Sequence, residues 1–140
     1  MATKVKLLIG KKGTGKTKNI IEGVNASAEQ SKGNVIFISS NTSRYNMDIK
    51  NTVRMIDTSE FKITTYKEFF GLICGVISSN YDITNIYVDS IFKIAIDDQM
   101  SGFYTFLERL ENVAARNNVS ISLCLSMDEN DAPDFAKKYL

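Results

Sequence analysis

The stretch from residue 10 to residue 17, Gly-Lys-Lys-Gly-Thr-Gly-Lys-Thr, restricts the fold of this chain more than any other sequence feature. It fits the phosphate-binding pattern G-x-x-x-x-G-K-[ST] at every fixed position. Such a loop needs a strand before it and a helix after it, because its backbone N–H groups converge at the positive end of that helix. Residues 4–9 are mostly apolar, as in a strand covered on both faces. Beyond the loop, apolar residues recur at helical spacing as far as about residue 30 (Ile20, Ile21, Val24 and Ala28).

Each residue type in the loop has a chemical reason to be there. Glycine allows the backbone to wrap closely around a pyrophosphate. Lys16 is expected to reach the β- and γ-phosphates, and the Thr17 hydroxyl to complete the coordination of Mg²⁺. The predicted ligand is therefore a nucleoside triphosphate, ATP or another, with Mg²⁺. The predicted nucleotide-binding residues are Gly10, Lys12, Gly13, Thr14, Gly15, Lys16 and Thr17. The alternative is a Gly/Lys-rich surface turn that matches the pattern by chance.

A second informative stretch is Asn85-Ile86-Tyr87-Val88-Asp89-Ser90, an apolar strand that ends in an acid. Ligands of open α/β sheets bind outside the carboxyl ends of the strands, so Asp89 is expected near the phosphates. A carboxylate there can hold Mg²⁺, usually through water. We therefore predict Asp89 as a metal-site and catalytic residue.

Other segments predict an alternating α/β chain with a mainly parallel sheet. Residues 34–39 form a second buried strand, which makes a βαβ unit. Residues 53–56 predict a short edge strand, and residues 61–64 another. Thr65 and Glu68 have the spacing of a capping box, so a helix is expected to follow through Ile77. This helix is apolar nearly all round and should be mostly buried, with Gly71 and Gly75 packed closely on the sheet.

The last third of the chain continues the alternation. Asp97 and Asp98 predict a solvated turn, and an amphipathic helix is expected from Phe103 to Ala114. Residues 119–126 predict the last strand, whose polar end should lie near the phosphates. Residues 132–139 predict a short helix with Pro133 in its first turn.

Composition excludes several functional classes. At 140 residues the chain is expected to form a single nucleotide-binding domain, 1–140, with two free cysteines, Cys74 and Cys124. The absence of histidine excludes a catalytic histidine and a structural zinc site of four Cys/His ligands. A net charge of +1 makes nucleic acid an unlikely partner. We expect no membrane span, because the longest apolar run is too short, and no signal peptide, so the predicted location is cytoplasmic.

Taken together, these elements resemble the P-loop NTPases, and residues 13–17 are similar to loops of their RecA-like, AAA-type and helicase branch. The resemblance implies a three-layer α/β/α fold in which the last strand separates the loop strand from the Asp-ending strand. It also implies that Ser126 occupies a polar sensor position facing the γ-phosphate, which makes Ser126 a candidate catalytic residue. Only one motor half fits in this length, so a helicase is unlikely.

Two departures from that branch bear on hydrolysis. Ser90 stands where a glutamate usually polarises the attacking water, and a serine cannot accept that proton at neutral pH. Either Asp97, Asp98 or Asp128 replaces it, or hydrolysis is slow. Secondly, the four arginines (Arg44, Arg54, Arg109 and Arg116) are each expected to be surface charges rather than an arginine finger.

Two weaker resemblances involve other parts of the chain. The sequence from Lys11 to Thr17 is similar to the deviant loop of the ParA/MinD family, although Lys12 replaces a glycine of that family. The short length and the run from Phe69 to Gly75 resemble small stand-alone bacterial ATP-binding proteins of unclear role. The histidine motif of hexameric motility motors has no counterpart here, so motor activity is not expected.

The function predicted first is a Mg²⁺-dependent ATP-binding protein, a slow ATPase or a nucleotide-dependent switch that acts with a protein partner or as a homo-oligomer. The segment 41–60 is expected to respond to the nucleotide or to the partner. Two alternatives stay open. One is a small-molecule or nucleoside kinase, and the other is a non-hydrolysing interaction module that is loaded with nucleotide for stability.

Overall fold

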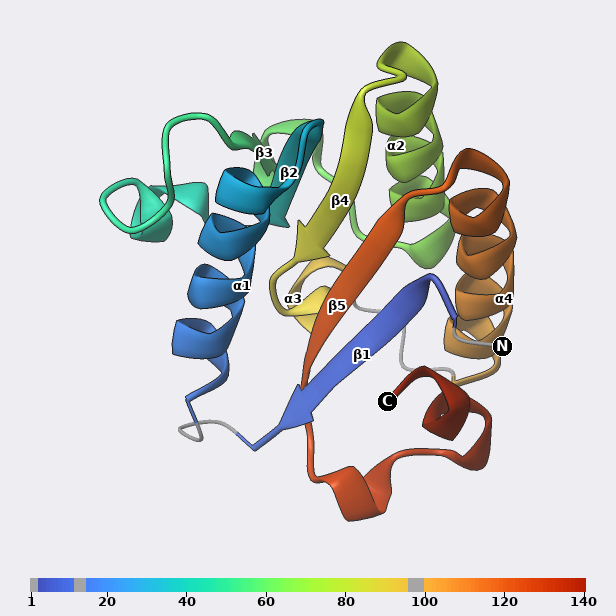
Figure 1. Cartoon of the computed structure of the whole chain (residues 1–140). Helices are drawn as coiled ribbons and strands as arrows, with labels where there is room; N and C mark the ends of the chain where they lie inside the picture. The colour runs from blue at the N-terminus through green and yellow to red at the C-terminus, as the bar shows by residue number, and fades with distance from the viewer. Residues whose placement is uncertain (1–2, 12–14, 96–99) are drawn as a thin grey trace.

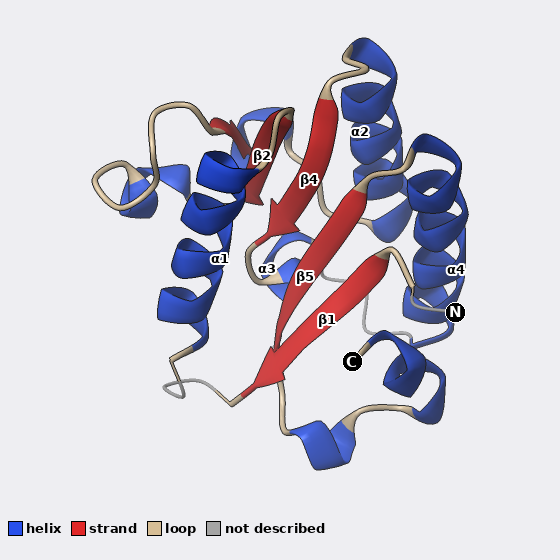
Figure 2. Cartoon of the chain, viewed as in Figure 1, coloured by secondary structure: helices blue, strands red, loops and turns tan. Residues whose placement is uncertain are grey.

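The computed structural model describes residues 3–11, 15–95 and 100–140. These residues form an α/β fold around a five-stranded sheet in which every strand pair is parallel (Figures 1 and 2). The strand order is β1-β5-β4-β2-β3. The strands are β1 (Val5–Gly10), β2 (Asn34–Ser39), β3 (Arg54–Asp57), β4 (Ile83–Val88) and β5 (Ser120–Ser126). The last strand therefore lies between the loop strand and the Asp-ending strand, as the family resemblance implied.

Helices cover both faces of this sheet. Helix α1 (Lys16–Gln30) packs on one face, and α2 (Tyr66–Ser79) and α4 (Met100–Asn117) pack on the other (Figure 1). Shorter elements complete the described chain: α3 (Ile91–Ile94) and the 3₁₀ helices η1 (Thr42–Tyr45), η2 (Thr58–Phe61), η3 (Glu129–Asp131) and η4 (Asp134–Tyr139). The arrangement is consistent with three layers, α/β/α.

Strand β2 shows why the sheet strands are apolar runs. Val35 and Phe37 belong to the core cluster under α1, whereas Ile36 and Ile38 belong to the cluster under α2 and α4. Successive side chains of a strand point to opposite faces, so a strand with helices on both sides needs apolar residues at every position. Alternation with polar residues would leave one helix layer without a core.

Helix α2 begins at the predicted capping box. The Thr65 hydroxyl accepts a hydrogen bond from the Glu68 backbone N–H at 3.1 Å, and the Glu68 carboxylate accepts one from the Thr65 N–H, also at 3.1 Å. The expectation of close packing at Gly71 and Gly75 is wrong. Both glycines are exposed, and a Cβ added to either would have no atom within 4 Å. Only one face of α2 is buried, because the helix lies on the outside of the sheet.

Two other expectations also need correction. Residues 61–64 form no strand, because the Asp57 carboxylate accepts a hydrogen bond from the Ser59 N–H at 2.9 Å and turns the chain into η2 directly after β3. Residues 134–139 form a 3₁₀ helix with Pro133 as its N-cap, rather than a helix with proline inside the first turn. The edge strand predicted at 53–56 is confirmed as β3. The turn predicted at Asp97 and Asp98 lies outside the described residues.

No helix in the described part of the chain is both long and apolar enough to cross a bilayer.

Candidate functional site

A cleft of about 580 Å³ lies at the carboxyl ends of β1, β5 and β4. Its lining includes five residues that the sequence predicted for the site: Gly15, Lys16, Thr17, Asp89 and Ser126. Four further residues, Arg44, Ser90, Lys93 and Cys124, complete it. Gly10 ends β1 but is not among the lining residues. Lys12, Gly13 and Thr14, which the sequence also predicted to bind nucleotide, lie outside the described residues.

Gly15 makes the turn from the loop into α1. Its φ of 88° lies in the left-handed region, which glycine adopts without the clash that a Cβ would cause. The Gly15 carbonyl accepts a hydrogen bond from the Asn19 N–H at 3.0 Å, so α1 begins at once with Lys16 and Thr17. The first N–H groups of a helix have no partner within it and are available to an anion.

Asp89 is the residue around which the site is hydrogen-bonded. It is only 8% exposed. Its Oδ2 accepts hydrogen bonds from the Tyr45 hydroxyl at 2.6 Å and from the Ser39 hydroxyl at 3.3 Å. Its Oδ1 accepts one from the Ser90 hydroxyl at 3.2 Å. Three hydroxyl donors therefore fix the orientation of the carboxylate. They come from the end of β2, the end of η1 and the N-cap of α3.

Tyr45 connects Asp89 to the segment after β2. The residue is 1% exposed, and both its burial and its hydrogen bond to Asp89 raise the pKa of the phenol above its ordinary value. The hydroxyl therefore stays protonated and remains a donor to the carboxylate. Tyr45 and Ser39 were not predicted as site residues. The sequence contained one signal for them: Ser39 ends strand β2 and Tyr45 follows it, at the edge of the sheet where Asp89 also lies.

The cleft is predominantly cationic. Lys16, Arg44 and Lys93 line it, against one carboxylate, Asp89, among the described lining residues. Arg44 is exposed, as predicted for a surface charge, but it also faces this cleft, with its Cζ 5.5 Å from the centroid of the Tyr45 ring. Such an excess of positive charge in a concave site favours anions.

Cys124 lies in the wall of the cleft as an inert thiol. Burial, together with the nearby Asp89 charge, raises the pKa of Cys124 to about 12, while Lys16 acts in the opposite direction. The thiol is therefore protonated at neutral pH and cannot serve as a nucleophile there. Both cysteines are free, as the sequence predicted.

Of the carboxylates predicted as possible replacements for the missing glutamate, Asp128 is engaged elsewhere. It forms an ion pair with Lys11 at 3.1 Å, and it does not line the cleft. A hydrogen bond from the Asn130 backbone and the Lys11 ammonium group hold the pKa of Asp128 below its ordinary value. Asp97 and Asp98 lie outside the described residues.

The donor set of the cleft fits Mg²⁺ bound together with a phosphate ligand. Within the described ranges there is no cluster of three or more Cys, Asp or Glu residues that could hold a metal. Mg²⁺, however, commonly binds through one or two protein oxygens, with water and substrate phosphates supplying the rest. Thr17 and Asp89 offer such oxygens in one cleft.

Comparison with known proteins adds no family. No protein-family model matches the chain, and no curated protein matches it in sequence. The interpretation of the cleft therefore depends on its own residues.

Proposed function

We propose that this chain is a Mg²⁺-dependent ATP-binding protein of the P-loop NTPase type, a slow ATPase or nucleotide-dependent switch that acts with a partner. The observation that carries the proposal is the meeting of Lys16, Thr17 and Asp89 in one cleft. Thr17 and Asp89 are 72 positions apart in sequence. The loop pattern predicted Lys16 and Thr17, and the Asp-ending strand predicted Asp89. A chance surface turn would have no reason to face an acid at the end of another strand.

The proposed roles follow from the charge and position of each side chain. Lys16 neutralises the β- and γ-phosphates, and Arg44 and Lys93 add positive charge around them. Thr17 and Asp89 hold Mg²⁺, which when bound neutralises charge on the phosphate oxygens. Ser126, at the end of β5, offers a hydroxyl to a ligand in the cleft.

Slow hydrolysis is supported by the environment of Ser90. The Ser90 hydroxyl donates to Asp89, and a serine cannot accept a proton from water at neutral pH. Asp89 is the only acid that lines the described part of the cleft, and Asp128 is paired with Lys11. A general base contributes about 10²- to 10⁴-fold in rate, so its absence favours long-lived nucleotide binding.

A switching role is supported by the hydrogen bonds that join Asp89 to the segment 42–53. Tyr45 donates to Asp89 from this segment. The same segment is attached to α1, because the Asn25 side chain donates to the Asp48 carbonyl at 2.8 Å and accepts from the Lys50 N–H at 2.9 Å. A metal ion held by Asp89 would draw negative charge away from the oxygen that Tyr45 orients, so metal binding would change the contacts of the whole segment.

The kinase alternative is supported by one observation, the position of Arg44. Kinases that transfer phosphate to small molecules use arginines on a mobile segment to cover the phosphates. Arg44 comes from a segment after β2 and lines the cleft. Transfer of labelled γ-phosphate to a nucleoside panel, without release to water, would favour a kinase over an ATPase.

The experiment that tests the proposal measures nucleotide binding and phosphate production together, with ATP or GTP, with Mg²⁺ or with EDTA. Binding that strengthens with Mg²⁺, with slow or no turnover, is expected. In Asp89→Asn the Mg²⁺-dependent part of the affinity should be lost while metal-free binding remains. Binding that is the same with Mg²⁺ and EDTA in both proteins would contradict the proposed metal site.

A further inference from the structure

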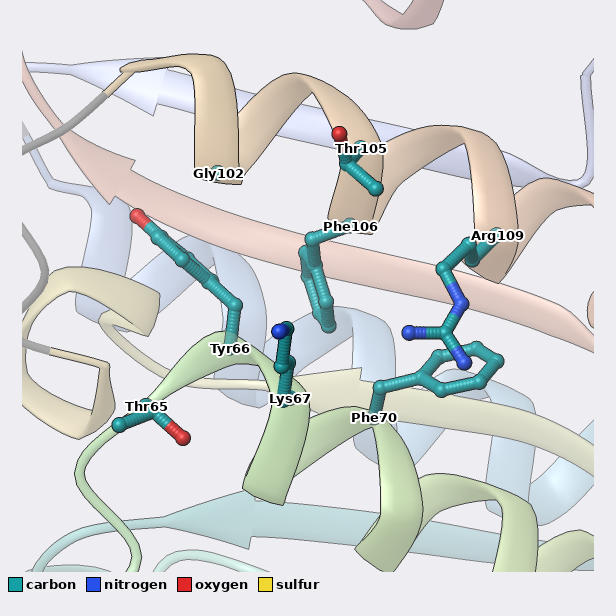
Figure 3. Close-up of a pocket in the computed structure, with 8 residues that line it drawn as sticks. All are labelled: Thr65, Tyr66, Lys67, Phe70, Gly102, Thr105, Phe106 and Arg109. Atoms are coloured by element: carbon teal, nitrogen blue, oxygen red, sulfur yellow. The ribbon is translucent and has the colours of Figure 1, made fainter.

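A second concave site lies between α2 and α4, on the face of the sheet opposite α1. It is a groove of about 470 Å³, and it shares no lining residue with the cleft that contains Lys16 and Asp89. Nothing in the proposed nucleotide chemistry uses it. Figure 3 shows that its side chains come from both helices.

The base of this groove is aromatic. Tyr66 and Phe106 are 5% and 3% exposed, and their ring centroids are 5.3 Å apart. Phe70 is half-buried beside them. All three rings line the groove, and Phe70 is the most exposed of them. Covering the exposed part of Phe70 is favourable, because burial of apolar area is stabilising.

Two cations flank this aromatic base. Lys67 projects from α2 and Arg109 from α4, so the charges reach the groove from opposite sides (Figure 3). Within the described residues neither has a carboxylate within ion-pair distance. The acids adjacent to them in sequence are used elsewhere, since Glu68 caps α2 and Glu108 bonds Tyr104.

Arg109 is held in a fixed position by stacking. Its Cζ lies 4.2 Å from the centroid of the Phe70 ring. A stacked guanidinium keeps its N–H groups free at the edge of the plane, where they match the two oxygens of a carboxylate. The groove therefore presents an oriented anion-binding group next to an apolar surface.

The surface beyond the groove is suited to a polypeptide rather than to a small molecule. Gly71 and Gly75 lie one and two turns beyond Lys67 on α2, and a Cβ at either would have no atom within 4 Å. A neighbouring backbone can approach such a surface closely. Small-molecule sites, in contrast, bury most of their ligand, whereas Lys67, Thr105 and Arg109 at the rim are all exposed.

We propose that the α2–α4 groove docks an acidic segment of a partner protein, with a carboxylate between Lys67 and Arg109 and an adjacent apolar side chain on Tyr66, Phe70 and Phe106. Charge complementarity selects the acid, and the aromatic base selects the apolar neighbour. Because the groove and the nucleotide cleft share no residue, docking does not require nucleotide, and failure of one proposal leaves the other standing.

The test uses the full chain and two displayed peptide libraries of about 12 residues, which is about three helical turns. One library combines Asp or Glu with Leu or Phe, and the other has Lys in place of each acid. We expect enrichment from the acidic library alone. Enriched peptides, measured by fluorescence polarisation, should bind Arg109→Glu and Lys67→Glu at least about tenfold more weakly, because the reversed charge repels the acid of the peptide. Binding should also weaken as salt rises.

The matched control is Arg116→Glu, a charge reversal at an exposed arginine in the last turn of the same helix but outside the groove. It should bind the peptides within about twofold of the parent chain, because it keeps the groove intact. Melting curves establish that all variants are folded.

Three results would overturn the proposal. The first is that no peptide is enriched on the parent chain relative to the Arg109→Glu variant. The second is that Arg116→Glu weakens peptide binding as much as Arg109→Glu does. The third is saturation of the groove by 4-phenylbutyrate with the affinity of the peptides, since the site would then bind small carboxylates rather than a protein segment.

Discussion

The Asp89 carboxylate accepts hydrogen bonds from three hydroxyls, and the contribution of Tyr45 can be isolated. Tyr45→Phe keeps the buried ring and removes the donor to Oδ2. A hydrogen bond to a charged group contributes about 1.5–3 kcal/mol, so unfolding free energy should fall by about that amount. The carboxylate would also be less well oriented, so the increase in ATP affinity caused by Mg²⁺ should shrink. Titrations with Mg²⁺ and with EDTA measure this difference.

Tyr139→Phe is the control for that experiment, because Tyr139 is also buried, at 2% exposed, but belongs to the core cluster on the other face of the sheet from Tyr45. It should leave the Mg²⁺ dependence unchanged. Equal Mg²⁺ dependence in Tyr45→Phe and the parent chain would show that Tyr45 does not position the metal ligand.

Ser90 is the residue at which turnover can be restored. Ser90→Glu adds a carboxylate beside Asp89, at a position that lines the cleft. Phosphate production should rise by about 10²-fold, which is the lower end of the range for a general base. Ser90→Gln has the same size and no proton acceptor of that kind, so it should not increase turnover. An equal increase in both variants would exclude general-base catalysis as the cause.

Residue-level expectations from the sequence succeeded where a motif specified the residue. Lys16, Thr17 and Asp89 meet in one cleft because each is fixed to the end of a strand or the start of a helix. Arg44 and Tyr45 were not predictable, because their positions depend on how a segment without regular periodicity folds back against α1. A sequence pattern contains no signal for such long-range contacts.

Helix α2 shows that sequence patterns also predict only part of the structure of an element. The capping box specified where the helix begins, but apolar periodicity did not reveal that Gly71 and Gly75 face solvent. Short segments such as 61–64 were assigned wrongly because a single side chain, Asp57, decides between strand and turn there. Local hydrogen bonds of this kind are weak individually and are not periodic.

The exposed glycines give a prediction for this helix. Gly71→Ala should stabilise the protein by about 0.5–1 kcal/mol, because alanine has the higher helix propensity and its Cβ meets no atom. Chemical denaturation measures the change. Gly33→Ala is the contrasting variant, since its Cβ would collide with the Asp82 carbonyl, and it should destabilise the fold. A destabilising Gly71→Ala would mean that this side of α2 is covered in the folded protein.

For the whole molecule, the strand order could be predicted only through the family resemblance. Apolar runs predict strands but not their neighbours, and the placement of β5 between β1 and β4 came from the implied fold. The sheet order in turn decides which strand ends meet, and therefore which residues can share a ligand.

The free energy of unfolding should depend on pH in the alkaline range, because the Cys124 thiol is buried in the folded chain. Burial raises the pKa of this thiol from 9.0 to about 12 in the folded chain. The unfolded chain therefore loses the proton first, and stability that is present below pH 9 declines as pH rises toward 12. Melting temperatures across this range should fall less steeply in Cys124→Ala. Identical slopes in both proteins would show that the thiol does not ionise on unfolding.

The most direct test of the nucleotide site is calorimetric titration of the chain with ATP and Mg²⁺, comparing Lys16→Ala with Lys18→Ala. Lys18 lies two residues further along α1, is exposed, and does not line the cleft. If the loop cradles phosphate, Lys16→Ala should weaken binding by about tenfold or more, while Lys18→Ala should bind like the parent chain. Unchanged affinity in Lys16→Ala, or no binding by the parent chain, would contradict a nucleotide site in this cleft.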